Sequence, residues 1–292
     1  MHLKRRAKAA TLQAASNAVR LPWGRAIAGQ MLHRLRIGFE PPSEAVGYPG
    51  GAEAAACVSI DFDANSPERL AANREGTYAL VELSEEHGIP LTWAICGKTA
   101  EQDMRAYHRL LDSAERKEIG VHTYSHLDVS RASEEQVRDE VLRCVGALGL
   151  RTFPSTFVFP WNREGHFELL RRMGFTAYRG ARRVIGAPSK RNGLWNIPPV
   201  FYVDHNSIGA GALIGRYIDA CVQFRSVFHL WLHPWSLVER GDLGAMLSTT
   251  MGPVFEHMGR MRDEGRLSAS TMGELSACME GDGRGIDLLL RT

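Results

Sequence analysis

Short apolar runs alternate with segments of helical periodicity along most of the chain after residue 51. A short apolar run bounded by turn residues is typical of a buried strand. Several runs here are bounded in this way. The pattern therefore predicts strands at 56–62, 91–96, 118–123, 156–160, 176–179, 194–200, 227–232 and 267–271.

Helical patterns lie between these runs, and two of them have recognisable starts. Ser66 and Pro67 provide an N-cap and a first-turn proline for a helix over 67–87. Ser133 and Gln136 form a capping box in front of another apolar stripe. Strands that alternate with helices favour a parallel sheet, and about eight of them favour a closed α/β barrel with TIM-barrel-like layering. Further helices are expected at 100–117, 134–148, 167–173, 211–223 and 245–263.

The predicted domain organisation has three parts. Residues 40–51 are rich in proline and glycine and are typical of a linker. We therefore expect a basic helical arm with its linker over 1–51, a single barrel over 52–280 and a C-terminal tail over 281–292. Of the 292 residues, 44% are hydrophobic and 23% are charged, which excludes disordered and fibrous classes.

Positive charge is concentrated at the N-terminus. Residues 1–39 contain eight Lys or Arg and no acid, whereas the rest of the chain carries 27 basic and 33 acidic residues. A basic arm on an acidic body is typical of contact with an anionic membrane or a phosphorylated ligand. A solvated helix packed on the domain is the alternative. We expect no nucleic-acid partner, because the body is acidic and has no binding motif, and the pattern carries no signal for the oligomeric state.

The cysteines indicate a reducing compartment. There are five, widely spaced and without a CxxC pair, so a disulfide framework and a cysteine-based zinc site are excluded. No stretch approaches the roughly 18 apolar residues of a membrane helix. The basic start lacks the apolar segment of a signal peptide. We therefore expect a cytoplasmic protein, with the arm able to hold it at the inner face of the membrane.

Two carboxylates close the first predicted strand. Asp61 and Asp63 stand two residues apart, so both side chains point to the same side of a strand. Two ionised carboxylates that close repel each other unless a cation lies nearby. The pair therefore indicates a cation site at the end of a barrel strand, where functional groups are expected. A helix cap by Asp63 and a simple hydrogen bond by Asp61 are the alternative.

A histidine pair follows the third predicted strand. His122 and His126 are four residues apart, and on a helical turn both imidazoles lie on one face, within reach of one metal ion. Two histidines and one carboxylate leave positions open for water, as catalytic metal sites require. We expect Zn²⁺, although Co²⁺, Ni²⁺ or Mn²⁺ would also suit these ligands. Two unrelated surface histidines are the alternative.

A third candidate cluster, with two histidines, lies in and directly after the strand at 227–232. His233 ends this apolar strand at the expected mouth of the barrel, where a histidine is placed for proton transfer. His229 and Trp231 share its face of the strand. We expect His229 to be a satisfied core residue, and core packing is also favoured for Trp231 because it lies in mid-strand.

Three motifs, in this order, resemble those of the NodB-type polysaccharide deacetylases, the metal-dependent carbohydrate esterases of family four. They are Ser-Ile-Asp-Phe-Asp at 59–63, His-Thr-Tyr-Ser-His at 122–126 and Leu-His at 232–233. The runs at 157–162 and 228–234 look like a bacterial branch associated with surface-polysaccharide synthesis. The resemblance covers about 55–275 of the chain and implies a distorted barrel of seven or eight strands.

The resemblance also implies a role for each matching residue. Asp63, His122 and His126 correspond to the metal ligands. Asp61 corresponds to the general base and His233 to the general acid. The residue that supports the histidine loop would be Thr123, and the substrate contacts that we expect are Pro160, Trp161, Asn162 and Trp235.

The chain departs from the family pattern in two places. The family has an arginine shortly before the proline that corresponds to Pro160, where it contacts the catalytic aspartate. This chain has Val158 and Phe159 there, so Arg163 or another arginine would have to substitute from a different direction. The family's aspartate that tunes the acid histidine has no clear counterpart, and Asp204 is the candidate.

These assignments predict a metal-dependent hydrolase that removes an N-acetyl or N-formyl group from an amino sugar. A cytoplasmic enzyme does not meet mature wall polymer, so we expect a nucleotide- or lipid-linked precursor of surface polysaccharide. Two alternatives are a catalytically idle sugar-binding or scaffold protein on the same barrel and an amidohydrolase for a small cyclic amide. A membrane adaptor that works mainly through its basic arm ranks last, because it leaves the three motifs unexplained.

Overall fold

The computed structural model describes residues 47–180, 188–239 and 242–281. The predicted basic arm over 1–39 lies outside these residues, and so does the predicted tail apart from its first residue. Membrane contact through the arm therefore stays a prediction. Among the described helices, none is both long and apolar enough to cross a membrane.

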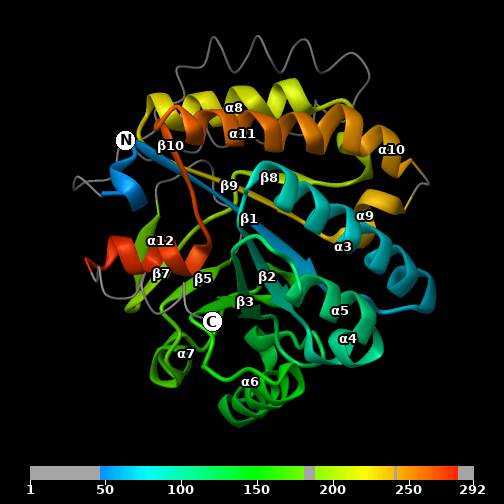
Figure 1. Cartoon of the computed structure of the whole chain (residues 1–292). Helices are drawn as coiled ribbons and strands as arrows, with labels where there is room; N and C mark the ends of the chain where they lie inside the picture. The colour runs from blue at the N-terminus through cyan, green and yellow to red at the C-terminus, as the bar shows by residue number, and fades with distance from the viewer. Residues whose placement is uncertain (1–46, 181–187, 240–241, 282–292) are drawn as a thin grey trace, which may run out of the picture.

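A ten-stranded sheet forms the centre of the molecule (Figure 1). Nine strands follow the order β6-β7-β5-β4-β3-β2-β1-β9-β8, and β10 pairs with β1. Every pair is parallel except β6 with β7. The strands are β1 (Ala54–Phe62), β2 (Leu91–Ile95), β3 (Lys117–Val121), β4 (Thr156–Val158), β5 (Ala177–Arg179), β6 (Ser189–Arg191), β7 (Leu194–Asn196), β8 (Phe201–Val203), β9 (Val227–Leu232) and β10 (Leu267–Ala269).

The predicted α/β class and distorted barrel are confirmed, with the barrel left open. The edge strands β6 and β8 do not pair with each other, so the sheet is a half-barrel. These two strands are also the ones that the apolar pattern missed. The three residues of β6 are all exposed, and two of the three in β8 are only half-buried, so neither produces a buried apolar run.

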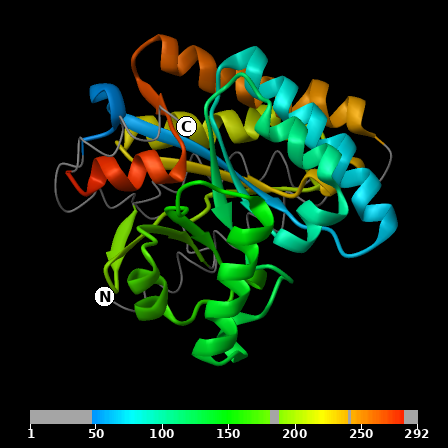
Figure 2. The same ribbon diagram turned by 60° about the horizontal axis from the view of Figure 1, so that its bottom comes forward.

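Helices cover the outside of the sheet, as Figures 1 and 2 show. α8 and α11 pack against each other on one side, while α3 packs against α5 and α9. The helices are α3 (Pro67–His87), α4 (Gly97–Gln102), α5 (Met104–Leu111), α6 (Glu134–Leu148), α7 (Phe167–Met173), α8 (Gly211–Gln223), α9 (Pro234–Val238), α10 (Leu243–Met246), α11 (Gly252–Asp263) and α12 (Met272–Met279), with short 3₁₀ turns η1 (Pro49–Gly51), η2 (Val129–Arg131), η3 (Pro160–Asn162) and η4 (His205–Ser207) and a π-helical turn η5 (Leu247–Met251).

Two predicted long helices are interrupted. The helix expected over 100–117 consists of α4 and α5, because Asp103 leaves the helical conformation and caps α5 by accepting a hydrogen bond from the Ala106 N–H. The helix expected over 245–263 contains the π-helical turn η5, directly before a proline in the first turn of α11. Proline has no N–H for the regular ladder, so the chain widens there.

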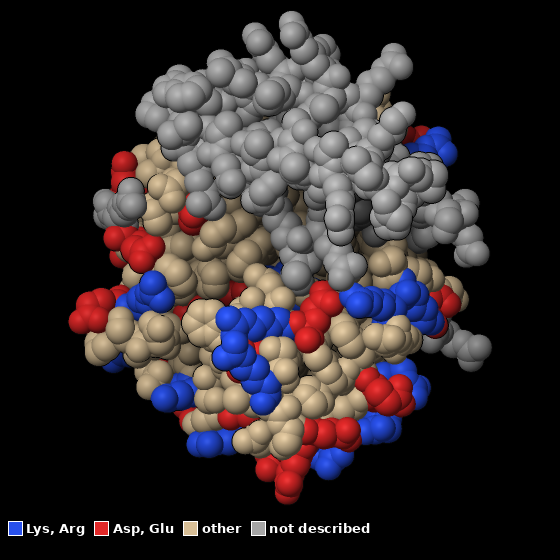
Figure 3. Space-filling model, turned by 180° about the vertical axis from the view of Figure 1, so that it is seen from behind, with Lys and Arg blue, Asp and Glu red and all other residues tan. Residues whose placement is uncertain are grey.

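The core and the surface follow the usual division for a covered parallel sheet. All nine residues of β1 are buried, and this strand contacts α8, α9 and α12 as well as its neighbouring strands. The five cysteines all belong to the described residues, and none is paired in a disulfide. On the face seen in Figure 3, basic and acidic side chains are interspersed over the described surface.

Candidate active site

The parallel sheet brings four strand ends to one place. Asp61 is the penultimate residue of β1 and Arg179 is the last residue of β5, while His122 and His233 directly follow β3 and β9. Carboxyl ends of parallel strands lie at the same edge. The curvature of the half-barrel then closes the remaining distance, because Arg179 on β5 reaches Asp61 on β1 although three strands separate them in the sheet.

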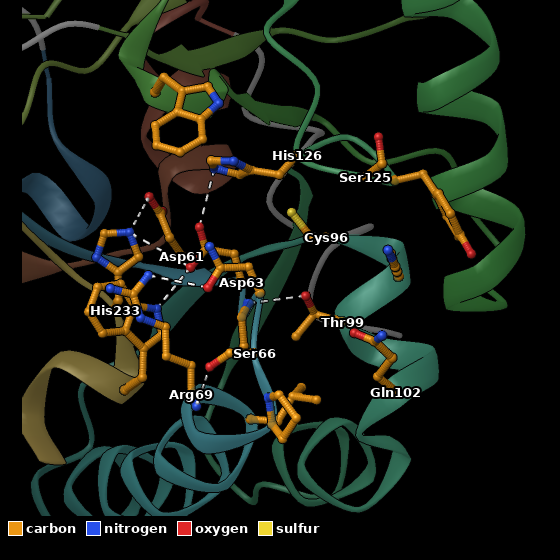
Figure 4. Close-up of a pocket in the computed structure, with 18 of the residues that line it drawn as sticks. Asp61, Asp63, Ser66, Arg69, Cys96, Thr99, Gln102, Ser125, His126 and His233 are labelled. Carbon is orange, nitrogen blue, oxygen red and sulfur yellow. Dashed lines mark hydrogen bonds and ion pairs between the residues drawn. The ribbon is translucent and has the colours of Figure 1, made fainter. Parts of the chain in front are cut away.

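The predicted metal ligands come together at this edge. Asp63, His122 and His126 each offer one ligand atom, and these atoms all lie within 4.8 Å of one another. His126 Nε2 is 3.2 Å from Asp63 Oδ2, and both residues face the cavity in Figure 4. The Trp235 indole N–H donates to Asp63 Oδ1 at 3.0 Å and so orients the carboxylate.

The protonation of the histidines fits a bound cation. His122 Nδ1 lies 2.8 Å from the carbonyl oxygen of Val158, which can only accept, so Nδ1 carries the proton and Nε2 keeps its lone pair. That Nε2 atom is buried and has no hydrogen-bond partner among the described residues. Burial lowers the pKa of His122, although the negative charge of Asp61 opposes this shift. Burial is also the largest cause that lowers the pKa of His126, to about 4. Both imidazoles are therefore neutral near pH 7, the state that binds a divalent metal.

The histidine loop is a bend and not the helical turn that the spacing predicted. Thr123 and His126 have φ values of 59° and 62°, in the left-handed region that a helix excludes. The Leu127 N–H donates to Thr123 Oγ1 at 2.9 Å, and the Lys98 N–H donates to the Tyr124 carbonyl at 2.9 Å. Thr123 is fully buried, which fits the predicted support of this loop. The two imidazoles meet because the loop folds back on itself.

Arg179 is the arginine that the sequence interpretation did not find. Its Nη2 donates to Asp61 Oδ2 at 2.5 Å, and both side chains are buried. The candidate Arg163, itself exposed, pairs with the half-buried Asp128 instead. An arginine at the end of the predicted strand 176–179 was the signal available, since the same position rule had identified Asp61 and His233.

Asp61 is held in its ionised form. Burial alone would raise the pKa of its carboxyl, but the charge of Arg179 outweighs burial and keeps the pKa well below its usual range. Oδ2 accepts from Arg179, whereas the buried Oδ1 has no hydrogen-bond partner in the part of the chain that the structure describes. Asp61 therefore offers one anchored oxygen and one available oxygen.

His233 lies opposite, between the two carboxylates. Its Nε2 is 3.7 Å from Asp61 Oδ2 and 3.8 Å from Asp63 Oδ1. Its Nδ1 is 3.3 Å from the Tyr202 hydroxyl. The candidate Asp204 was wrong as the partner of this ring: its side chain caps η4 by accepting from the Asn206 N–H at 2.9 Å. Tyr202 takes the position at the His233 ring.

The comparisons with known proteins agree with this site. Residues 50–161 match the polysaccharide deacetylase family. This segment contains Asp61, Asp63 and both loop histidines, and it ends before Arg179 and His233. The match supports the predicted enzyme class, a sugar N-deacetylase of the hydrolases. No curated protein sequence matches the chain at a significant level.

Solved structures resemble this chain over a longer stretch than the family match does. A protein from Mycobacterium smegmatis named as a polysaccharide deacetylase has 17% identity and a TM-score of 0.64, over 81% of this chain and 93% of that one. A second protein of that name, from Pseudomonas aeruginosa, has 13% identity and a TM-score of 0.60, over 83% and 99%. A Puue allantoinase has 14% identity and a TM-score of 0.57, over 83% and 98%.

A cavity of about 710 Å³ opens beside this group of strand-end residues (Figure 4). Three of the four expected substrate contacts line it, namely Trp161, Asn162 and Trp235, whereas Pro160 is buried and is not among the lining residues. Trp231 also lines the cavity, so the expectation of pure core packing was wrong for it. Trp231 is the penultimate residue of β9, so its side chain lies near the strand end that borders the cavity.

Gly76 in α3 lies against the backbone that follows His233. A Cβ atom on Gly76 would lie 2.1 Å from the carbonyl oxygen of Pro234. Gly76→Ala must therefore displace Pro234 and, with it, the His233 ring. We expect this change to lower kcat about 10- to 100-fold, as small displacements of catalytic groups do.

Steady-state rates and metal content of the purified variant would test this expectation. The matched control is Gly146→Ala in α6, where the added methyl group meets nothing within 4 Å, and its kcat should equal that of the wild type. A wild-type kcat for Gly76→Ala would mean that His233 does not depend on the packing of α3.

Proposed function

We propose that the protein is a metal-dependent hydrolase that removes an N-acetyl or N-formyl group from an amino sugar. One observation carries the proposal: three residues able to hold a divalent cation lie directly beside an ionised carboxylate and a third histidine, at the wall of one cavity. The residues that would hold the cation are Asp63, His122 and His126, and Zn²⁺ is the proposed metal, with Co²⁺, Ni²⁺ or Mn²⁺ as alternatives.

The remaining groups are arranged for amide hydrolysis. A bound divalent cation would polarise the amide carbonyl and acidify a water molecule. Asp61, ionised and anchored through Oδ2, accepts the proton of the attacking water on Oδ1. His233 donates a proton to the departing nitrogen, because an amine leaves poorly unless it is protonated. Water adds to the carbonyl carbon and the C–N bond breaks, which yields acetate or formate and an amino sugar.

The aromatic rim of the cavity supports a sugar substrate. Trp161 is 62% exposed, and its ring lies 4.6 Å from that of His126. Trp161 also has φ 58°, a conformation rarely held by a bulky residue without a functional constraint. An exposed indole beside the reacting group offers an apolar face on which a sugar ring can pack.

Replacement of Trp161 by alanine should therefore raise KM about tenfold and lower kcat by less than about threefold, since a lost stacking contact removes binding in ground and transition states alike. Initial rates over a range of substrate concentrations separate the two constants. Trp161→Phe keeps an aromatic face and should recover most of the affinity. A KM that is unchanged in Trp161→Ala would exclude this residue from the substrate site.

We propose a nucleotide- or lipid-linked precursor as the substrate, in the cytoplasm or at the inner face of the membrane. Two cationic residues, Arg69 and Lys98, line the same cavity, and a cation favours a phosphate group near the sugar. The basic segment 1–39 suits the same chemistry or an anionic membrane surface.

The test is release of acetate or formate by the Zn²⁺-loaded protein from nucleotide-linked, lipid-diphosphate-linked and free N-acylated amino sugars. Small cyclic amides belong in the panel, because the fold also occurs in an allantoinase. Release from the linked sugars alone supports the whole proposal. Turnover of cyclic amides only would favour the amidohydrolase, and bound metal without any turnover would favour an idle sugar-binding protein.

A further inference from the structure

A further histidine, His229, lies on the side of Arg179 that is away from the cavity. His229 in β9 and Ser59 in β1 are both fully buried, and neither is among the residues that line the cavity. Ser59 Oγ lies 2.7 Å from His229 Nε2 and accepts from Arg179 Nη1 at 2.8 Å. The other terminal nitrogen of the same guanidinium donates to Asp61. A continuous chain of hydrogen bonds therefore leads from His229 to the carboxylate.

The direction of every bond in this chain can be assigned. His229 Nδ1 lies 2.9 Å from the carbonyl oxygen of Ile197, which can only accept, so Nδ1 carries the proton. Nε2 of the neutral ring is then an acceptor, and the Ser59 hydroxyl must donate to it. The lone pairs of Ser59 Oγ are thereby turned toward Arg179, which can only donate.

The ring stays neutral because of where it lies. Burial, followed by the charge of Arg179, lowers the pKa of His229 to about 3. A protonated Nε2 would donate to Ser59 and would place a second positive charge beside the guanidinium. The neutral ring instead acts as a fixed acceptor, which leaves the serine hydroxyl a single orientation.

The guanidinium needs this support because it is completely buried. Among the described residues its partners are few. Ser59 and Asp61 accept from its two terminal nitrogens, and the centre of the Trp231 ring lies 4.4 Å from its central carbon. A buried charge is costly unless its donors are paired, so removal of one partner lets the group move. Movement of Arg179 would turn Asp61 Oδ1 away from the reacting water.

We propose that Ser59 and His229 are positioning residues that fix the Arg179 guanidinium and, through it, the orientation of the Asp61 carboxylate. The proposal rests on the proposed function in so far as Asp61 is the base. It adds two residues outside the cavity to the requirements for turnover.

A double-mutant cycle tests this inference. Ser59→Ala should lower kcat about tenfold with KM and metal content unchanged, since it disturbs the orientation of a catalytic group and not substrate binding. Arg179→Ala should cost more, and adding Ser59→Ala to it should cost nothing further, because the serine acts through the arginine. Losses that multiply in the double variant would overturn the inference, since they would show independent structural roles.

A matched pair at His229 gives a second readout. The glutamine side chain can put an acceptor near the position of Nε2, whereas asparagine can replace only the Nδ1 donor. His229→Gln should therefore keep a kcat nearer to that of the wild type than His229→Asn, at equal thermal stability. The reverse order would contradict the acceptor role of Nε2.

A spectroscopic measurement separates this inference from the proposed function. In the metal-loaded full-length protein, ¹⁵N shifts of the His229 ring should report a protonated Nδ1 and an unprotonated Nε2 from about pH 5 to pH 8, and the Nε2 shift should change in Ser59→Ala. If the wild type hydrolyses no amide, the proposed function fails while the shifts still test the network. A ring protonated on Nε2 would overturn the network even in an active enzyme.

Discussion

Asp61→Asn should lower kcat by about 10²- to 10⁴-fold, the contribution of a general base. The asparagine has the same shape and can still accept from Arg179, but it cannot take a proton from water. In the wild type, Arg179 overcomes the effect of burial on the Asp61 pKa, so the base is ready at neutral pH. Acetate release at saturating substrate measures the change, with metal content determined on the same sample.

The metal should remain in Asp61→Asn, because the proposed ligands are Asp63, His122 and His126. The matched control is Asp204→Asn, the same chemical change at the cap of η4, where asparagine caps equally well. Its kcat should stay within about twofold of the wild type. If Asp61→Asn kept more than about a tenth of the wild-type kcat, another group would have to be the base.

His122→Ala should release the metal and abolish turnover with it. His122 provides a preoriented Nε2 lone pair, fixed by the bond from Nδ1 to Val158. Removal of an outer-shell partner already costs about 10- to 100-fold in metal affinity, so loss of a ligand should cost more. Elemental analysis after dialysis should find about one equivalent of metal in the wild type and far less in the variant.

His257→Ala is the control for this experiment. His257 bridges α11 to α8 through Asp219, at 2.8 Å, so its loss should leave the metal content unchanged. One equivalent of metal in His122→Ala would remove His122 from the ligand set. Loss of metal from both variants would point to a general loss of the fold, which thermal unfolding would reveal.

The elements with strong local signals could be read from the sequence. The strand at 227–232 and the helix at 67–87 have the predicted bounds, because a continuous apolar run and a Ser-Pro start are properties of neighbouring residues. The short edge strands β6 and β8 could not be read, because β6 is fully exposed and β8 is only partly buried, so neither forms a buried apolar run. The break between α4 and α5 depends on one cap, that of Asp103, within a pattern that otherwise continues.

The residues of the candidate site also fall into those that the sequence reveals and those that it does not. Asp61, Asp63, His122, His126 and His233 were found because each stands at or just after a predicted strand end in a recognisable motif. Arg179 was missed because no motif surrounds it, and Tyr202 because it lies in an unpredicted strand. Trp231 was misjudged because it was taken as a mid-strand residue, whereas it lies next to the end of β9, beside the cavity.

The amino-acid sequence by itself determines the alternation of strands and helices and the residue types at the strand ends. Both can be predicted from it, because each depends on neighbours within a few positions. Which strand ends face each other depends on the curvature and register of the whole sheet. That arrangement puts the Arg179 charge of β5 against Asp61 of β1 and places Ser59 and His229 behind it. Such contacts join residues more than 100 positions apart, and folding forms them through packing and burial that no local pattern encodes.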